Sequence, residues 1–146
     1  MAVKAFSIED GNLSASIVTT RNKKYSDIDL TFTARPSGDV YKKIDAAAVK
    51  QSVKNLLLTS RYEKPFQPNF GANLNSALFA LDTDYDPDYI QDLIADAIAK
   101  YEPRARVLEI SLNLLPETNA LDATIIFQVV NTNETVSVDV SLTRLR

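Results

Sequence analysis

The spacing of apolar residues changes from a helical to an extended period at Pro103. Before the proline, apolar side chains recur every three or four positions: Ile90, Leu93, Ile94, Ala97, Ile98 and Tyr101. After it they recur every second position: Leu108, Ile110, Leu112 and Leu114, then Leu121, Ala123, Ile125, Phe127 and Val129, then Val136, Val138, Val140 and Leu142. The change predicts a helix followed by three antiparallel strands that share one apolar face.

Two further helices are expected upstream of that sheet. Asp45 precedes a helical apolar pattern near 45–60, and Asn73 can begin a short helix. Asp86 and Pro87 are typical cap and first residues of the helix that Pro103 ends. Residues 61–72 carry two prolines, a glycine and three aromatics, so we expect a loop that packs against the body. The fold class is therefore α+β, with about three helices on one face of a three- to four-stranded antiparallel sheet.

The first 27 residues look like an arm or a marginal hairpin, and residues 28–146 form a single domain. Leu30, Phe32 and Ala34 alternate with threonines and predict a short strand, which ends at a turn over 36–39.

The composition excludes several kinds of chemistry. The chain has no cysteine and no histidine, so it lacks thiolate and Ser-His-Asp catalysis and the commonest metal ligands. A formal charge of −3 disfavours nucleic acid as a partner. No apolar run is long enough to span a bilayer, and a charge near the amino end does not fit a secretory signal. We expect no cofactor, no metal and no membrane contact.

Acidic residues offer two catalytic or binding hypotheses, and both are weak. Asp82, Asp84, Asp86 and Asp88 alternate, but the glycine and glutamate that a calcium loop needs are replaced by Pro87 and Leu93. Acids gathered at a helix N-terminus explain the pattern better. Two carboxylates could hydrolyse a glycoside, but no acid among the 19 lies in a catalytic motif.

The segment Glu102-Pro103-Arg104 has two interpretations. It can be a proline stop with a cation at the helix C-terminus. Alternatively, Glu102 and Arg104 flank an extended proline and point toward one partner, where Arg104 forks a carboxylate.

The last strand has two interpretations as well. It ends close to residue 146, so we expect it to be a sheet edge that is either a plain core strand or a strand that recruits another chain. The residues concerned are Thr135, Val136, Ser137, Val138, Asp139, Val140, Ser141 and Leu142.

These features, in order, resemble the baseplate wedge family of contractile tails, which includes the sheath-initiator wedge subunit of T-even-type phages and its type VI secretion counterpart. The matching pieces are the Gly38-Asp39 turn, the helix over 48–59, the loop Lys64-Pro65-Phe66-Gln67-Pro68-Asn69-Phe70-Gly71, Leu78-Phe79, and the helix that runs into Tyr101-Glu102-Pro103-Arg104. The resemblance covers roughly residues 28–146 and nothing before them.

The resemblance implies a structural subunit, not an enzyme. It implies that Glu102, Pro103 and Arg104 dock to other wedge subunits, and that residues 135–142 pair with the tail sheath protein and start its polymerisation. Tube or hub-proximal baseplate proteins are further expected partners, in a virion baseplate assembled in the host cytoplasm or in a bacterial secretion baseplate. The alternatives are a lysozyme-like peptidoglycan hydrolase, a label that some members carry, and an assembly adaptor.

Overall fold

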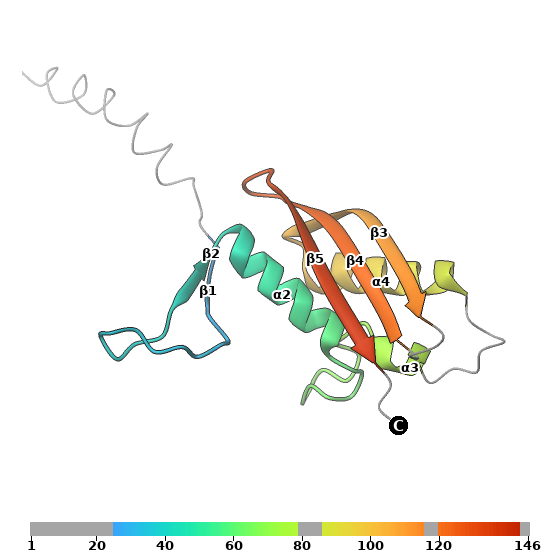
Figure 1. Cartoon of the computed structure of the whole chain (residues 1–146), viewed down its shortest axis with the longest axis horizontal. Coiled ribbons are helices and arrows are strands. Elements are labelled where there is room, and N and C mark those ends of the chain that lie inside the picture. Colours follow the sequence, from blue (N-terminus) through green and yellow to red (C-terminus); the bar gives the residue numbers. More distant parts are fainter. Residues whose placement is uncertain (1–24, 79–85, 116–119, 144–146) are drawn as a thin grey trace, which may run out of the picture.

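The computed structural model describes residues 25–78, 86–115 and 120–143, and within them the fold is α+β, as predicted. Figure 1 shows the elements, which in chain order are β1 (Ser26–Ile28), β2 (Lys42–Ile44), α2 (Ala46–Leu58), α3 (Leu74–Leu78), α4 (Pro87–Tyr101), β3 (Ala105–Leu115), β4 (Ala120–Val129) and β5 (Thr135–Thr143). Strands β3, β4 and β5 form an antiparallel meander in that order, and β1 and β2 form a separate two-stranded ribbon.

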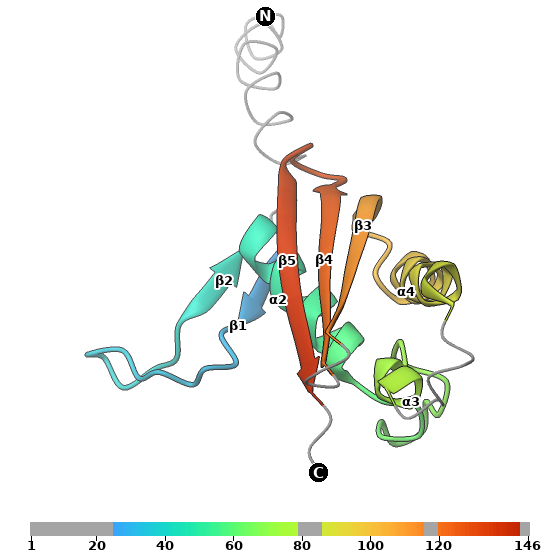
Figure 2. The ribbon, with the colours of Figure 1, turned by 45° about the vertical axis from the view of Figure 1, so that its right-hand side comes forward.

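Helices α2 and α4 pack on the apolar face of the meander. Helix α2 contacts β5 and α4 contacts β3, while the two helices also touch each other (Figure 2). The core between these layers includes Val53, Leu56 and Leu57 of α2, Ile94 and Ile98 of α4, and Ile125, Phe127 and Val138 of the sheet, all with at most 2% exposure. The alternation predicted for β4 and β5 is confirmed, because their core-facing residues are buried, or partly buried at Val136 and Leu142, and the intervening ones other than Ala120 are more exposed.

The alternation predicted for β3 is wrong at Leu108. A β-bulge shifts the register between Val107 and Glu109, so Leu108 has no partner on β4 and is 54% exposed. Beyond the bulge the core-facing positions resume at Ile110. One extra residue in a strand moves every later side chain to the opposite face, and the bulge absorbs that shift.

The two long helices begin differently. At α4 the carboxylate of Asp86 accepts the amide of Asp88 at 3.0 Å and Pro87 takes the first position, as predicted. At α2 the predicted N-cap residue, Asp45, is confirmed in position, but its carboxylate makes no capping hydrogen bond and accepts one from the amide of Tyr25 instead. Ile44 stays 54% exposed, so it adds little apolar burial at this helix start. The Asp45 side chain therefore holds the preceding chain, while its carbonyl accepts the amides of Ala48 and Val49 in the first turn of α2.

The loop over 61–72 exists, but only one of its three aromatics packs against the body. Phe70 lies 5.1 Å from the ring of Tyr101 and contacts the core, whereas Tyr62 is 81% and Phe66 fully exposed. Gly71 closes the loop at a φ of +105°, where a Cβ would lie 2.2 Å from the carbonyl oxygen of Thr59.

The strand predicted over 30–34 is also wrong. The strand lies earlier, in β1, and Asp29 then turns the chain: its carboxylate accepts the amide of Thr31 and its carbonyl accepts that of Phe32. Ala34 makes only an isolated bridge with Val40 across the predicted turn. The predicted arm over 1–27 lies outside the described residues except for its last three.

Candidate docking sites

The bend after α4 holds an internal ion pair. Glu102 follows the last residue of α4, and its side chain is 5% exposed. Arg104 donates to both of its carboxylate oxygens, from Nε at 2.5 Å and from Nη2 at 2.6 Å, and the Ser52 hydroxyl of α2 donates to Oε2. The carboxylate that Arg104 forks is therefore that of its own chain.

The surroundings of Glu102 favour its charged form. Burial acts to raise its pKa, but the hydrogen bonds from Arg104 and Ser52, together with the attraction of the guanidinium, hold the pKa below its ordinary value of 4.5. The same pair raises the pKa of Arg104. Both groups are thus ionised at neutral pH, and each stabilises the charge of the other.

This ion pair lies where the β1–β2 ribbon joins the body. The guanidinium carbon of Arg104 stands 5.3 Å from the centre of the Tyr25 ring. Gln51 of α2, which is 9% exposed, donates to the carbonyl of Ile28 at 2.8 Å and accepts from the amide of Leu30. The bend, α2 and the ribbon are therefore joined by polar contacts.

The three predicted docking residues thus play different parts in the structure. Glu102 is buried and turned inward, Pro103 is exposed, and Arg104 keeps 31% of its side chain exposed. Arg104 uses two of its five N–H donors on Glu102, so others remain for a partner. Sequence reasoning missed Ser52, Gln51 and Tyr25 at this site, because they lie 50 to 79 residues from Glu102 and Arg104 along the chain and form no motif with them.

The second candidate site is the outer edge of β5. In the part of the chain that the structure describes, β5 pairs with β4 and with no strand on its other side. The amide of Val129 donates to the carbonyl of Glu134 at 2.9 Å, and the register continues unshifted to Ala120 opposite Thr143. Hydrogen-bonded pairs alternate along an antiparallel ladder, so every second residue of β5 turns its N–H and C=O away from β4. These residues are Thr135, Ser137, Asp139, Ser141 and Thr143.

A shallow hollow of about 410 Å³ lies along this edge. It is lined by Lys54 and Leu58 of α2 and by residues on both faces of β4 and β5, among them Asp139 and Ser141. Leu58 is 40% exposed there. An added strand would therefore meet unpaired backbone groups with apolar surface and a cation beside them.

The described residues hold no arrangement suited to acid catalysis. Glu102 is the one buried carboxyl among them, and its lowered pKa is the opposite of what a glycosidase general acid needs. A larger open hollow of about 830 Å³, between α4 and the 61–72 loop, has Asp92 and Asp96 on its wall, but both are exposed.

The described residues form neither a cluster of metal ligands nor a membrane-spanning helix. No group of three or more acidic residues could hold a metal ion, although Asp82 and Asp84 of the alternating acids lie outside the described residues. No helix among the described elements has the length and hydropathy to cross a membrane.

The comparisons with known proteins agree with one another. The family model for baseplate wedge protein gp25 matches residues 44–134. Baseplate wedge protein gp25 of Enterobacteria phage T4 is 30% identical over 95 residues, which are 65% of this chain and 70% of the relative.

Two solved structures share the fold. A subunit of the anti-feeding prophage baseplate has a TM-score of 0.65 and 21% identity over 78% of this chain and 92% of its own. A Geobacter sulfurreducens protein provisionally named a tail lysozyme has a TM-score of 0.58 and 20% identity over 67% of this chain and 89% of its own.

Proposed function

Because the chain belongs to the baseplate wedge protein gp25 family, we propose that it is a non-enzymatic subunit that starts tail-sheath polymerisation on a contractile-tail baseplate. In this proposal a strand of the first sheath ring is added to the outer edge of β5. The observation that carries the proposal is the set of outward backbone groups on Thr135, Ser137, Asp139, Ser141 and Thr143, with no described strand opposite them.

Strand addition suits the start of a polymer. Backbone hydrogen bonds give a directional contact that does not require matched side chains, so the same contact can be repeated. The five residues whose backbone groups face outward carry polar side chains on the solvent face of the sheet. Such side chains keep an unpaired edge soluble before the sheath arrives. Leu58, in the hollow beside the edge, would contact the added strand.

The bend after α4 is proposed as the attachment to other wedge subunits. Glu102 acts there by holding the guanidinium of Arg104, while Pro103 and the exposed part of Arg104 touch the partner. Tube or hub-proximal baseplate proteins are the other proposed partners, and assembly takes place in the cytoplasm of the host.

Proline substitution tests the edge, because proline removes one backbone donor. In Asp139→Pro and Ser137→Pro the lost donor faces outward, so both variants should fold with near-normal stability and fail to nucleate sheath. Val138→Pro is the matched control, because its donor faces β4 and its loss should destabilise the sheet.

The assay mixes each variant with the cognate wedge subunits and sheath protein and counts sheaths by electron microscopy. Normal nucleation by both outward variants would refute strand addition at β5. Arg104→Ala should separately weaken wedge assembly, and normal baseplates from it would count against the docking role of the bend.

Two rival functions have cheap tests. A peptidoglycan hydrolase would clear a zymogram and lose that activity when one acid is substituted. The lowered pKa of buried Glu102 argues against Glu102 as its general acid. An assembly adaptor would be missing from purified tails, whereas a wedge subunit should be present there at fixed stoichiometry.

A further inference from the structure

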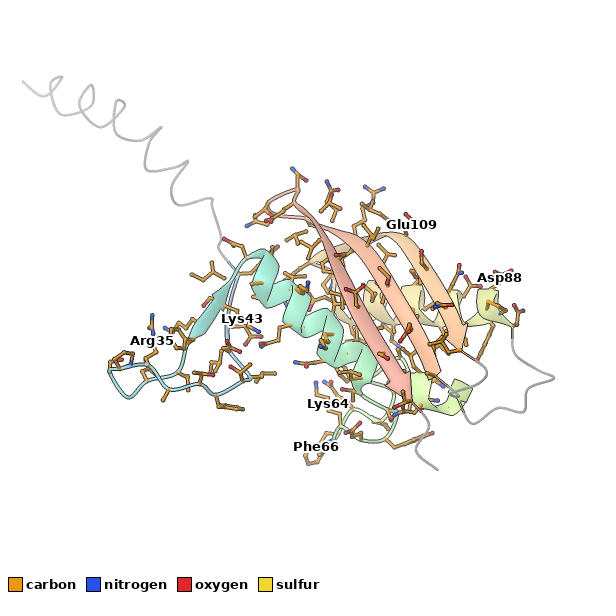
Figure 3. The ribbon with its side chains drawn as sticks, viewed as in Figure 1. Arg35, Lys43, Lys64, Phe66, Asp88 and Glu109 are labelled. Atoms are coloured by element: carbon orange, nitrogen blue, oxygen red, sulfur yellow. The ribbon has the colours of Figure 1, made fainter. Side chains whose placement is uncertain are left out.

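Two aromatic side chains of the 61–72 loop stand in solvent. Tyr62 is 81% exposed and Phe66 is fully exposed, and Figure 3 shows Phe66 directed away from the body below α2. Aromatic side chains are enriched at protein–protein interfaces relative to the rest of the surface and often anchor them. We refer to Tyr62 and Phe66 as the aromatic anchor.

The loop that carries the aromatic anchor is held in one shape. The amide of Tyr62 donates to the carbonyl of Pro68 at 2.8 Å across the loop. The amide of Gln67 donates to the carbonyl of Lys64 at 3.2 Å. Below them the Tyr101 hydroxyl donates to the Asn69 carbonyl at 2.7 Å. Two prolines, Pro65 and Pro68, fix two more backbone angles. Little conformational freedom is left for a partner to remove.

Both residues of the aromatic anchor have a strained backbone. Tyr62 has a φ of 67° and Phe66 a φ of 65°, a region that bulky residues rarely occupy. Their side chains gain nothing in return within the chain, because they are exposed. Glycine or asparagine would be less strained at both positions, so folding does not explain these aromatics. Strain of this kind is expected where a residue is positioned for function.

The charges beside the anchor indicate what it meets. Arg61, Glu63 and Lys64 leave the loop with one net positive charge on a chain whose net charge is −3. Lys64 lies over the Phe70 ring at 4.1 Å, and Glu63 accepts the amide of Ser60. Arg61, next to the anchor, makes no ion pair with a described residue, although it lines the same hollow as Asp92 and Asp96.

We propose that Tyr62 and Phe66 insert into an apolar pocket with an acidic rim on another baseplate subunit. The proposal rests on the proposed function for its choice of partner, and it adds an attachment separate from both β5 and the bend after α4. A fixed, shaped pocket favours a rigid pair of rings, which a fluid lipid surface does not require.

The test measures the affinity of the full-length chain for each purified cognate wedge subunit, with the subunits immobilised. Tyr62→Asn and Phe66→Asn should each weaken binding to one subunit by about tenfold or more, the loss typical of an anchoring aromatic. Their urea midpoints should equal or exceed that of the wild type, because asparagine tolerates a positive φ. Arg61→Gln should slow association and reduce its dependence on salt.

Tyr89→Gln is the matched control, since Tyr89 is an aromatic that is 64% exposed on α4 with no backbone strain. Unchanged binding of the asparagine variants, a fall in their stability, or an equal loss in Tyr89→Gln would overturn the proposal. If the wild type binds and nucleates sheath while Phe66→Asn does the same, only the anchor is refuted. If the wild type binds no wedge subunit, the proposed function fails with it.

Two other occupants are separated by parallel measurements. Sedimentation over a range of concentrations would reveal self-association, and its loss in Phe66→Asn would assign the anchor to a second copy of this chain. Flotation with anionic phospholipid vesicles would reveal a membrane contact in the same way. Either result would overturn the proposal, and a monomer that leaves vesicles unbound supports it.

Discussion

Substitution of Arg104 by alanine should destabilise the protein far more than a surface arginine would. The change leaves the Glu102 carboxylate, which is 5% exposed, with Ser52 as its remaining side-chain partner. Breaking a buried ion pair costs about 3–5 kcal/mol, whereas an exposed pair contributes about 0.2–1 kcal/mol. Since 31% of the Arg104 side chain is exposed and Ser52 remains, we expect a loss of about 2–3 kcal/mol. In a domain of this size that lowers Tm by roughly 8–12 °C.

Urea denaturation of the purified chain measures the loss, with Arg106→Ala as the control, because Arg106 is an exposed arginine two residues further on, in β3. A double-mutant cycle with Glu102→Met and Arg104→Met should give a coupling energy of roughly 2 kcal/mol, because removing both charges leaves no ion unpaired. A cost for Arg104→Ala no greater than that for Arg106→Ala would show that the pair is solvated and the reasoning wrong.

The same pair makes stability depend on pH. The pKa of Glu102 is lower in the folded chain than its ordinary value of 4.5, so the unfolded chain takes up a proton first as pH falls. The stabilisation by this ion pair is therefore complete above about pH 4.5. It disappears as the pH falls through the pKa of Glu102 in the folded chain. The difference in free energy of unfolding between the wild type and Arg104→Ala should be constant near neutral pH and should become smaller in acid. A gap that widens in acid would contradict the assignment.

Two further substitutions test how the loop and the ribbon are held. Gly71→Ala should lower the free energy of unfolding by about 2–4 kcal/mol, because its Cβ would meet the Thr59 carbonyl at a φ of +105°. Gly38→Ala is the control: its Cβ would meet open space at a φ of +81°, so the loss should be only about 1–2 kcal/mol. Equal urea midpoints for the two variants would contradict this reason for a glycine at 71. Gln51→Leu should release the ribbon, because the carbonyl of Ile28 loses its hydrogen-bond donor. The expected loss in the free energy of unfolding is about 1–3 kcal/mol. Trypsin should then cut the ribbon faster than in the wild type while the sheet stays protected, and unchanged cleavage would exclude this anchoring.

The helices and the sheet could be predicted because their signals are local. The cap and the proline stop of α4 and the alternation of the strands are patterns of residues that lie close together in the sequence. The burial of α4 and β4 confirms both predictions. The bulge at Leu108 was missed because a leucine there continues the alternation without a break. The turn at Asp29 was missed because its two hydrogen bonds compete with a strand pattern that looks adequate on its own.

The candidate sites could be predicted only in part, for a different reason. The segment 102–104 and the last strand stand out in the sequence, but the direction of a side chain or of an N–H does not. Ser52, 50 residues from Glu102, decides where that carboxylate points. A single hydrogen bond at the Val129–Glu134 turn decides which half of β5 faces outward. The loop aromatics were expected to be buried because burial is the usual fate of such residues.

The alternation along β5 divides two tasks between two sets of residues. Val138 and Val140 supply hydrophobic contacts to the core, and the positions between them turn their backbone groups away from β4. Substitutions in one set can therefore leave the other untouched. Under the proposed strand addition, the solvent-facing side chains of β5 could vary while its interior stays fixed, because the added strand would pair with the backbone.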